Sequence, residues 1–208
     1  MPANDFHTTV QLRTLQIRIA KEDETAFTQL YLYFSKKLIH FAVSLIRSRE
    51  IAEELVEDVF VKLWANRGHI TEIENLTVYL YVAVKNKSLN ALSQKAKDLV
   101  ISPFDYLDTT VDEFAADPYD LMITTEMMGR MYQAIESLPP RCKMIFKLIR
   151  EDGLKYKDIG AILNISVNTI DAQMAIALKK ICTALQIKKP SGPHQSHSLP
   201  IHKTAKKN

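Results

Sequence analysis

The side chains best suited to contact another molecule lie in ISVNTIDAQMAIALKK, residues 165–180. Ile170, Met174 and Ile181, with Ala177 or Leu178 between them, recur at helical spacing, which predicts an amphipathic helix. The outward positions near its start are Asn168, Thr169, Asp171, Ala172 and Ala175, with Gln173 beside them. Amide and hydroxyl groups can hydrogen bond to base edges or phosphates, and small alanines let a backbone approach a DNA groove. The alternative interpretation is an ordinary helical hairpin with a polar face.

A shorter helix and a turn precede this stretch in KYKDIGAILN, residues 155–164. The predicted buried stripe of that helix is Tyr156, Ile159 and Leu163. Gly160 lies where the two helix axes would cross, and Asn164 can adopt the left-handed conformation that ends a helix. Ser166 can then cap the next helix by accepting amide hydrogen bonds. Lys155 and Lys157 would supply cations for DNA phosphates beside the helix pair.

A second candidate binding surface is acidic and lies in REIAEELVEDVFVKLW, residues 49–64. One face of the predicted helix is apolar, and the other carries five acids, among them Glu54, Glu57 and Asp58. Like charges at spacings of three and four residues repel each other until a cation neutralises them. Two interpretations stay open, a solvated surface or a docking face for a basic partner helix.

A third candidate surface lies in NLTVYLYVAVKNKSLNALSQKAK, residues 75–97. Its polar and aromatic residues of interest are Tyr79, Tyr81, Lys85, Asn86 and Asn90. Aromatic rings can stack on unpaired bases while lysines neutralise phosphates, which is the chemistry of single-strand binding. The alternative is that the tyrosines belong to the core, which leaves the basic end of the helix unexplained.

Helices must position these surfaces, because the sequence lacks strand patterns. The chain has 208 residues, 47% of them apolar, and only five glycines. No stretch alternates apolar and polar residues for long enough to predict a sheet. We therefore predict an all-α chain with three or four helices between Glu24 and Lys97, interrupted at residues 47–50 and 66–75. A second helical unit runs from Thr124 to Gln186, with Pro139 and Pro140 in the first turn of one of its helices.

Charge divides the chain into four segments. Residues 98–126 hold eight acidic and no basic side chains, whereas residues 188–208 hold five basic and no acidic ones. Residues 1–97 and 127–187 are mildly basic. We predict two small folded domains, 1–97 and 127–187, an acidic flexible linker, 98–126, and a basic disordered tail, 188–208.

The sequence carries no signature of an enzyme, a metal site or a bound cofactor. It has no glycine-rich phosphate loop, no paired metal-ligand motif and no nucleophile elbow. Cys142 and Cys182 lack CxxC or Cys/His spacing, which favours reduced, apolar filler roles. The start of the chain lacks the apolar run of a signal peptide, and no window reaches the roughly 18 apolar residues of a membrane span. We expect a cytoplasmic protein.

Taken together, these segments resemble the extracytoplasmic-function (ECF) group of bacterial sigma factors in the sigma-70 superfamily. The matching stretches are DETAFTQLYLYFSKKLIHFAVSLIRSREIAEELVEDVFVKLW, LTVYLYVAVKNKSLNALS and ESLPPRCKMIFKLIREDGLKYKDIGAILNISVNTIDAQMAIALKKI. Their order and spacing, with the linker between them, carry the match. The resemblance implies sigma region 2 in residues 1–97 and sigma region 4, containing a helix-turn-helix, in residues 127–187.

For region 2, the resemblance implies two binding roles. In the family, the acidic helix docks on the coiled coil of the RNA polymerase clamp, which would place Glu54, Glu57 and Asp58 at that interface. The following helix binds the melted non-template strand of the minus-ten promoter element, and a pocket for an extruded base offsets part of the cost of unstacking. The implied minus-ten contacts are Tyr79, Tyr81, Lys85, Asn86 and Asn90.

For region 4, the resemblance implies binding of the minus-thirty-five element as duplex and docking of the polymerase flap tip. The implied DNA contacts are Ser166, Asn168, Thr169, Asp171, Ala172, Gln173, Ala175, Lys155 and Lys157. Asp171 then becomes a selectivity filter, because a carboxylate can accept a hydrogen bond from a cytosine amino group but repels phosphates. The family also implies an anti-sigma partner and association with the nucleoid when the factor is active.

Two functions compete at this stage. The first is a dissociable factor that gives core RNA polymerase its promoter specificity and performs no covalent chemistry. The second is a stand-alone helix-turn-helix regulator that binds an operator as a dimer. Dimer contacts and tight operator binding without polymerase would favour the second function.

Overall fold

The computed structural model describes residues 9–95 and 125–185 of the chain. These residues form helices and no strand, which confirms the all-α prediction. In chain order the elements are α1 (Thr9–Ile19), α2 (Glu24–Ile46), α3 (Arg49–Ala65), the 3-10 helix η1 (Arg67–Glu72), α4 (Leu76–Lys95), α5 (Thr125–Glu136), α6 (Pro140–Arg150), α7 (Tyr156–Leu163) and α8 (Val167–Ala184). The predicted tail and nearly all of the predicted linker lie outside the described residues.

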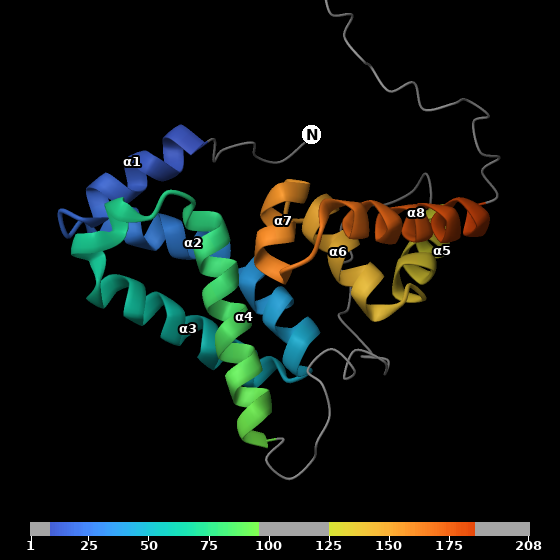
Figure 1. The fold of residues 1–208 in the computed structure, drawn as a ribbon, viewed down its shortest axis with the longest axis horizontal. Helices are drawn as coiled ribbons and strands as arrows, with labels where there is room; N and C mark the ends of the chain where they lie inside the picture. Colours follow the sequence, from blue (N-terminus) through green and yellow to red (C-terminus); the bar gives the residue numbers. More distant parts are fainter. Residues whose placement is uncertain (1–8, 96–124, 186–208) are drawn as a thin grey trace, which may run out of the picture.

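The helices pack as two units that touch each other. Helices α1 to α4 form the first unit and α5 to α8 form the second, while α7 lies against α4 and α6 approaches α2 (Figure 1). Helix α4 therefore belongs to the core of the first unit and also faces the second.

Helix α1 is an element that the sequence did not predict. Leu15 and Ile19 are buried, but the side chain of Gln16 is also buried and interrupts the apolar stripe. The Gln16 amide donates to the backbone carbonyls of Ile70 at 2.7 Å and Ile73 at 2.9 Å, at the end of η1. A buried amide is tolerated when its hydrogen bonds are satisfied, so a polar residue attaches α1 to the unit.

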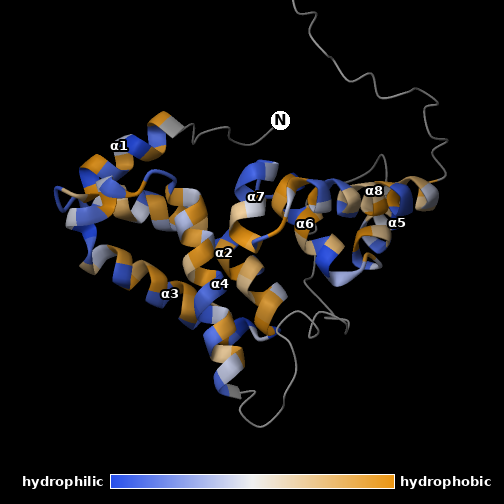
Figure 2. Cartoon of the chain, viewed as in Figure 1, coloured by the Kyte–Doolittle hydropathy of each residue, from blue (hydrophilic) through white to orange (hydrophobic). Residues whose placement is uncertain are grey.

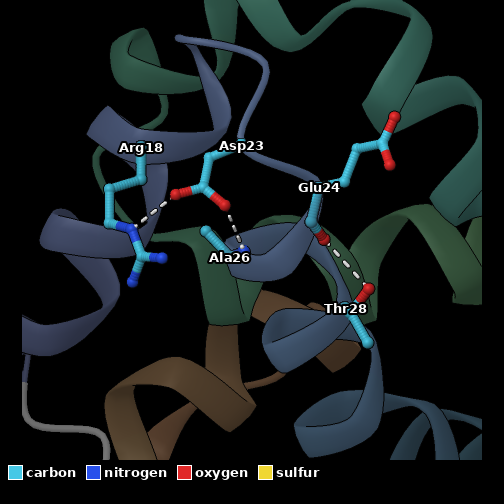
Figure 3. A network of polar contacts seen from close by, with 5 residues as sticks. All are labelled: Arg18, Asp23, Glu24, Ala26 and Thr28. Atoms are coloured by element: carbon cyan, nitrogen blue, oxygen red, sulfur yellow. Dashed lines mark hydrogen bonds and ion pairs between the residues drawn. The ribbon is translucent and has the colours of Figure 1, made fainter.

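A capping contact joins α1 to α2 (Figure 3). The carboxylate of Asp23 accepts from the backbone amide of Ala26 at 3.0 Å and from Nε of Arg18 at 2.8 Å. The amide hydrogen bond and then the guanidinium hold the pKa of Asp23 below its ordinary value. Within the first turn of α2, Thr28 donates its hydroxyl proton to the carbonyl of Glu24 at 2.9 Å. Asp23 thus fixes where α2 begins.

Helix α3 packs on α2 through aromatic rings. The ring of Phe27 lies 6.1 Å from Phe60 and 4.9 Å from Trp64, and the ring of Tyr31 lies 5.0 Å from Phe60. Arg47 adopts a left-handed conformation with φ of 56°, and Ser48 caps α3. The predicted interruption near residues 47–50 is confirmed, because the chain reverses there.

The apolar face predicted for residues 49–64 is also confirmed. Its inward residues are Ala52, Val56, Val59, Phe60 and Leu63, which are buried, and Leu55 and Trp64, which are half-buried. Polar and apolar residues are interleaved along the described helices (Figure 2). Among these helices, none is by itself long and apolar enough to cross a bilayer; α7 and α8 reach that length and apolarity only as a pair, bent by 107°.

The helix pair α7–α8 forms as predicted. Asn164 ends α7 with φ of 55°, and the Ser166 hydroxyl accepts from the amide of Thr169 at 3.1 Å to begin α8. A β-carbon on Gly160 would lie 3.0 Å from the carbonyl oxygen of Ile165, so the missing side chain permits this turn. The buried stripe of α8 is Ile170, Met174, Ala177 and Ile181, which leaves Leu178 exposed.

We expect Gly160→Ala to lower the stability of the chain by about 1 kcal/mol, because the clash with the Ile165 carbonyl outweighs the better helix propensity of alanine. The matched control is Gly129→Ala in α5, where a β-carbon meets nothing within 4 Å. That variant should be neutral or more stable by up to about 1 kcal/mol. Thermal and urea unfolding measure the stability of both variants. A Gly160→Ala variant that is more stable than the chain would contradict close packing at the turn.

Candidate nucleic-acid interface

The start of α8 presents an exposed polar face. Asn168, Asp171, Ala172 and Ala175 are exposed, and Gln173 is half-buried. The buried stripe on the opposite side packs α8 against α6 and α5, so the rest of the unit fixes the orientation of this face. The small side chains of Ala172 and Ala175 would allow this face to approach closely the walls of a groove in a large ligand.

Two of the predicted DNA contacts, Ser166 and Thr169, have hydroxyl groups that also stabilise the start of α8. Ser166 accepts from the amide of Thr169, and the two hydroxyl oxygens lie 2.8 Å apart. Their positions at the N-terminus of α8 are therefore set by the cap, and the helix dipole adds partial positive charge there. Lys155 and Lys157, at the start of α7, are both exposed and add full positive charges to the same unit.

The predicted residues of α4 do not share one exposed surface. Asn86 and Asn90 are exposed, and Tyr79 is 44% exposed. Lys85 is half-buried, whereas Tyr81 is fully buried and packs its ring 5.2 Å from Phe41. In this arrangement a nucleic-acid strand can reach three of the five residues, and the second unit engages the other two.

Three hydrogen bonds connect α4 or the residue before it to α7 and the turn that precedes it. Tyr81 donates its hydroxyl proton to Asp152 at 2.6 Å, and the Lys85 ammonium donates to the Ile162 carbonyl at 2.7 Å. The amide of Asn75 donates to Asp158 at 3.1 Å. Asn75 also caps α4, accepting from the amide of Val78 at 3.1 Å. The second unit thus forms polar contacts with the surface of α4 that is the candidate single-strand site.

The Asp152 carboxyl group lies in a desolvated position between the units. Burial raises its pKa from 3.8 to about 6, although the hydrogen bond from Tyr81 and the nearby ammonium groups of Lys37 and Lys147 act in the opposite direction. Burial and the adjacent carboxylate also raise the pKa of Tyr81, which stays protonated and donates. Near neutral pH this contact therefore holds a charged group in an unfavourable environment.

The acidic face of α3 is solvent-facing. Glu54 and Glu57 are exposed, while Asp58 forms a salt bridge with Lys87 of α4. The hydrogen bond and charge of Lys87 hold the pKa of Asp58 below its ordinary value. Asp58 is therefore partly neutralised within the unit, which leaves Glu54 and Glu57 as the more available acids of the predicted docking set.

Neither cysteine is paired in a disulfide. Cys142 is buried and its thiol donates to the carbonyl of Gln173 at 3.1 Å, while Cys182 is half-buried. Burial raises the pKa of the Cys142 thiol, which disfavours a reactive thiolate. Across residues 9–95 and 125–185, no three His, Cys, Asp or Glu side chains gather in a way that could hold a metal ion.

Asn75, Asp152 and Asp158 were not predicted from the sequence, although all three form hydrogen bonds between the units. The hydrogen bonds of this contact connect residues 83, 71 and 77 positions apart. Side chains this distant leave no periodic or local signal in a single sequence.

Two family models match the chain, one described as "Sigma-70 region 2" over residues 30–98 and one as "Sigma-70, region 4" over residues 128–181. Together they span more than half of its 208 residues. The chain is 24% identical over 175 residues to the ECF RNA polymerase sigma-E factor of Escherichia coli (strain K12), covering 81% of this chain and 91% of that protein. It is 23% identical over 176 residues to the RNA polymerase sigma-H factor of Pseudomonas aeruginosa, with the same coverage.

A solved structure shares the fold. It is the sigma factor RpoE in complex with the anti-sigma factor NepR from Bartonella quintana, with a TM-score of 0.55 and 22% identity. The match covers 78% of this chain and 98% of the RpoE chain, so both helical units take part in the likeness.

We expect the contact between the units to weaken as the pH rises through about 6. Because packing raises the pKa of Asp152, its contribution to stability is complete below about pH 4 and is lost as the carboxyl ionises in place. Asp152→Asn removes the titration and keeps an acceptor for Tyr81. As the pH rises from about 4 to about 7, the unfolding free energy of the chain should fall relative to that of this variant. The other titrating groups contribute equally to both proteins and so drop out of the difference. Parallel pH profiles would contradict this assignment.

Proposed function

The chain belongs to the sigma-70 family, in its extracytoplasmic-function group, and we propose that its two helical units bind separate parts of one promoter. It is a promoter-specificity factor that directs transcription initiation by core RNA polymerase, not a stand-alone regulator. The observation that supports the two-site proposal best is the exposed polar face of α8, held in a capped helix pair within the unit that matches region 4.

The proposed minus-thirty-five site is the N-terminal half of α8 with the start of α7. Asn168 and Gln173 offer amides for base edges, while Ala172 and Ala175 allow close approach in the major groove. Asp171 supplies selectivity for one base, and Lys155 and Lys157 supply affinity for phosphates. Ser166 and Thr169 hold the helix end in place and can offer their hydroxyls to the backbone.

The proposed minus-ten site is α4. Tyr79, Asn86 and Asn90 are exposed there and suit stacking and hydrogen bonding to an unpaired strand. Tyr81 and Lys85 complete the site once the second unit has moved away from them. Holding one extruded base offsets part of the unstacking cost, which is a few kcal/mol.

The proposed polymerase site is the acidic face of α3, with Glu54, Glu57 and Asp58 against the clamp coiled coil. The exposed Glu54 and Glu57 support this proposal, because a carboxylate is recognised more readily when it is not already paired within its own chain. An apolar surface of the second unit would receive the flap tip.

The remaining roles follow from the family. We propose that residues 1–97 and 127–187 act as region 2 and region 4, joined by the acidic segment 98–126 and followed by the basic tail 188–208. The relative of known structure is recorded with an anti-sigma factor, and we propose a partner of that kind here. The factor would act in the cytoplasm, on nucleoid DNA, without covalent chemistry or a cofactor of its own.

Run-off transcription with purified core RNA polymerase and a promoter library tests the function. We expect the chain to select a subset of promoters. We also expect the double variant Glu54→Lys/Glu57→Lys to show core affinity and transcript yield lower by more than about tenfold, because of charge repulsion. The control is Glu72→Lys/Glu74→Lys, which makes the same charge change at exposed residues outside α3. Failure of the chain to bind core or to redirect initiation would overturn the proposed function.

Asp171→Ala tests the minus-thirty-five site. We expect this variant to bind non-cognate duplex several-fold more tightly and to lose about 1–3 kcal/mol of discrimination at one upstream base pair. Glu136→Ala is the matched control, because it removes an equal charge from the same unit at an acid that pairs with Lys143 and Lys147. Quantitative binding to a duplex library measures both effects, and an equal loss at every sequence would contradict the assignment.

A further inference from the structure

The first residue of α8 has an apolar side chain that the fold leaves exposed. Val167 begins the helix and is 44% exposed. It follows the Ser166 cap directly and lies in the first turn of the helix half that is proposed to bind duplex DNA. The residues assigned to that site so far are polar, charged or small, and none of them has a branched hydrocarbon side chain.

Two other apolar residues beside the cap already stabilise the start of the helix. Ile165 precedes Ser166 and packs against the buried core, and Ile170, four residues after Ser166, is fully buried. These are the two positions of a hydrophobic staple, which fixes the angle at which the chain enters a helix. Val167 is not part of that pair, so its exposed methyl groups are available for a contact outside the chain.

The side chain of Val167 is held in place before any ligand arrives. The Ser166 hydroxyl accepts from the amide of Thr169 at 3.1 Å, and the two hydroxyl oxygens lie 2.8 Å apart, so the backbone is fixed on both sides of Val167. A β-branched side chain in a helix has one strongly preferred rotamer. Little conformational entropy is therefore lost when a ligand packs against Val167.

The position of Val167 relative to Asp171 indicates where on a duplex it would lie. Residues four apart project from the same side of a helix, and they are separated by about 6 Å along its axis. Successive bases on a DNA strand are about 3.4 Å apart along the duplex axis. A helix that brings Asp171 to one base pair in the major groove would therefore bring Val167 to a base pair one or two steps away.

Thymine has the chemistry that matches an apolar side chain at this place. In unmodified DNA it is the base that presents a methyl group in the major groove, where the other bases present hydrogen-bonding groups. Val167 cannot hydrogen bond through its side chain, but its methyl groups can remove a thymine methyl group from water. The first turn of α8 also carries no acid, so Val167 can approach the groove without a carboxylate beside it in that turn.

We propose that Val167 contacts the methyl group of one thymine in the upstream promoter element, one or two base pairs from the base pair that Asp171 contacts. Val167 is thus a specificity-determining residue, because it favours thymine over the other bases at that position. This inference rests on the proposed minus-thirty-five site and adds an apolar contact to it.

The test uses the complex of the full chain with core RNA polymerase and a promoter that the chain selects. Each thymine of the upstream element is replaced in turn by deoxyuridine, which removes the methyl group and keeps every hydrogen-bonding group. Competition binding then gives the ratio of affinities for the two DNA forms with the chain, with Val167→Ala and with the control Leu178→Ala. Leu178 is 43% exposed in the same helix but lies nearer its C-terminal end.

For the chain, we expect deoxyuridine at one position to weaken binding about threefold, which is the order expected for burial of one methyl group. That position should lie one or two base pairs from the one at which Asp171→Ala relaxes base preference. Val167→Ala should bind the two DNA forms with nearly equal affinity there, whereas Leu178→Ala should keep the threefold preference. Because each result is a ratio between two DNA forms, a change in folding or in polymerase affinity does not imitate it.

Three results would overturn the inference about Val167 and leave the promoter function intact. They are a thymine preference that Val167→Ala retains, a sensitive thymine elsewhere in the element, and the absence of any position sensitive to deoxyuridine. Failure of the complex to form on any promoter would instead remove the proposed function, and the inference with it.

Discussion

Every helix leaves amide groups unpaired at its start and carbonyl groups unpaired at its end, and the architecture of this chain depends on where those groups find partners. Asp23, Ser48 and Ser166 satisfy amides at the starts of α2, α3 and α8. At the C-terminal end of α7, the Ile162 carbonyl accepts a hydrogen bond from Lys85, which belongs to the other unit. The same local requirement therefore sets the helix boundaries and provides one contact between the units.

Helix α4 contacts elements of the other surfaces that are proposed to have separate functions, because it packs against both α3 and α7. It packs into the first unit, and Lys87 ties it to Asp58 on the acidic face of α3. Its other side meets α7, through residues that suit nucleic-acid binding. A partner that changed the position of α3 or displaced α7 would therefore alter the α4 surface directly, without a long path of coupled residues. The surfaces proposed for polymerase binding and for strand binding are thus adjacent in this fold.

Much of the fold and part of the site could be predicted from the sequence, because local patterns carry them. Helical periodicity identified α2 to α8, and Gly160, Asn164 and Ser166 predicted the turn between α7 and α8 from backbone preferences alone. The exposed face of α8 followed from its buried stripe. Helix α1 was missed because the buried Gln16 breaks its apolar pattern, and a satisfied amide cannot be foreseen without its partners. Burial of Tyr81 is one of the two interpretations that the sequence leaves open, but its hydrogen bond to Asp152 could not be predicted, because no sequence spacing connects the two residues.

We propose that one chain presents α8 to duplex DNA and α4 to a melted strand within the same polymerase complex. Site-specific photo-crosslinking measures this most directly, with a photoreactive side chain placed at Ala172 or at Tyr79 in the complex of the chain with core RNA polymerase and a selected promoter. We expect crosslinks from position 172 to upstream duplex and from position 79 to the non-template strand of the melted region. Crosslinks from both positions to one duplex segment, or from neither position to promoter DNA, would contradict it.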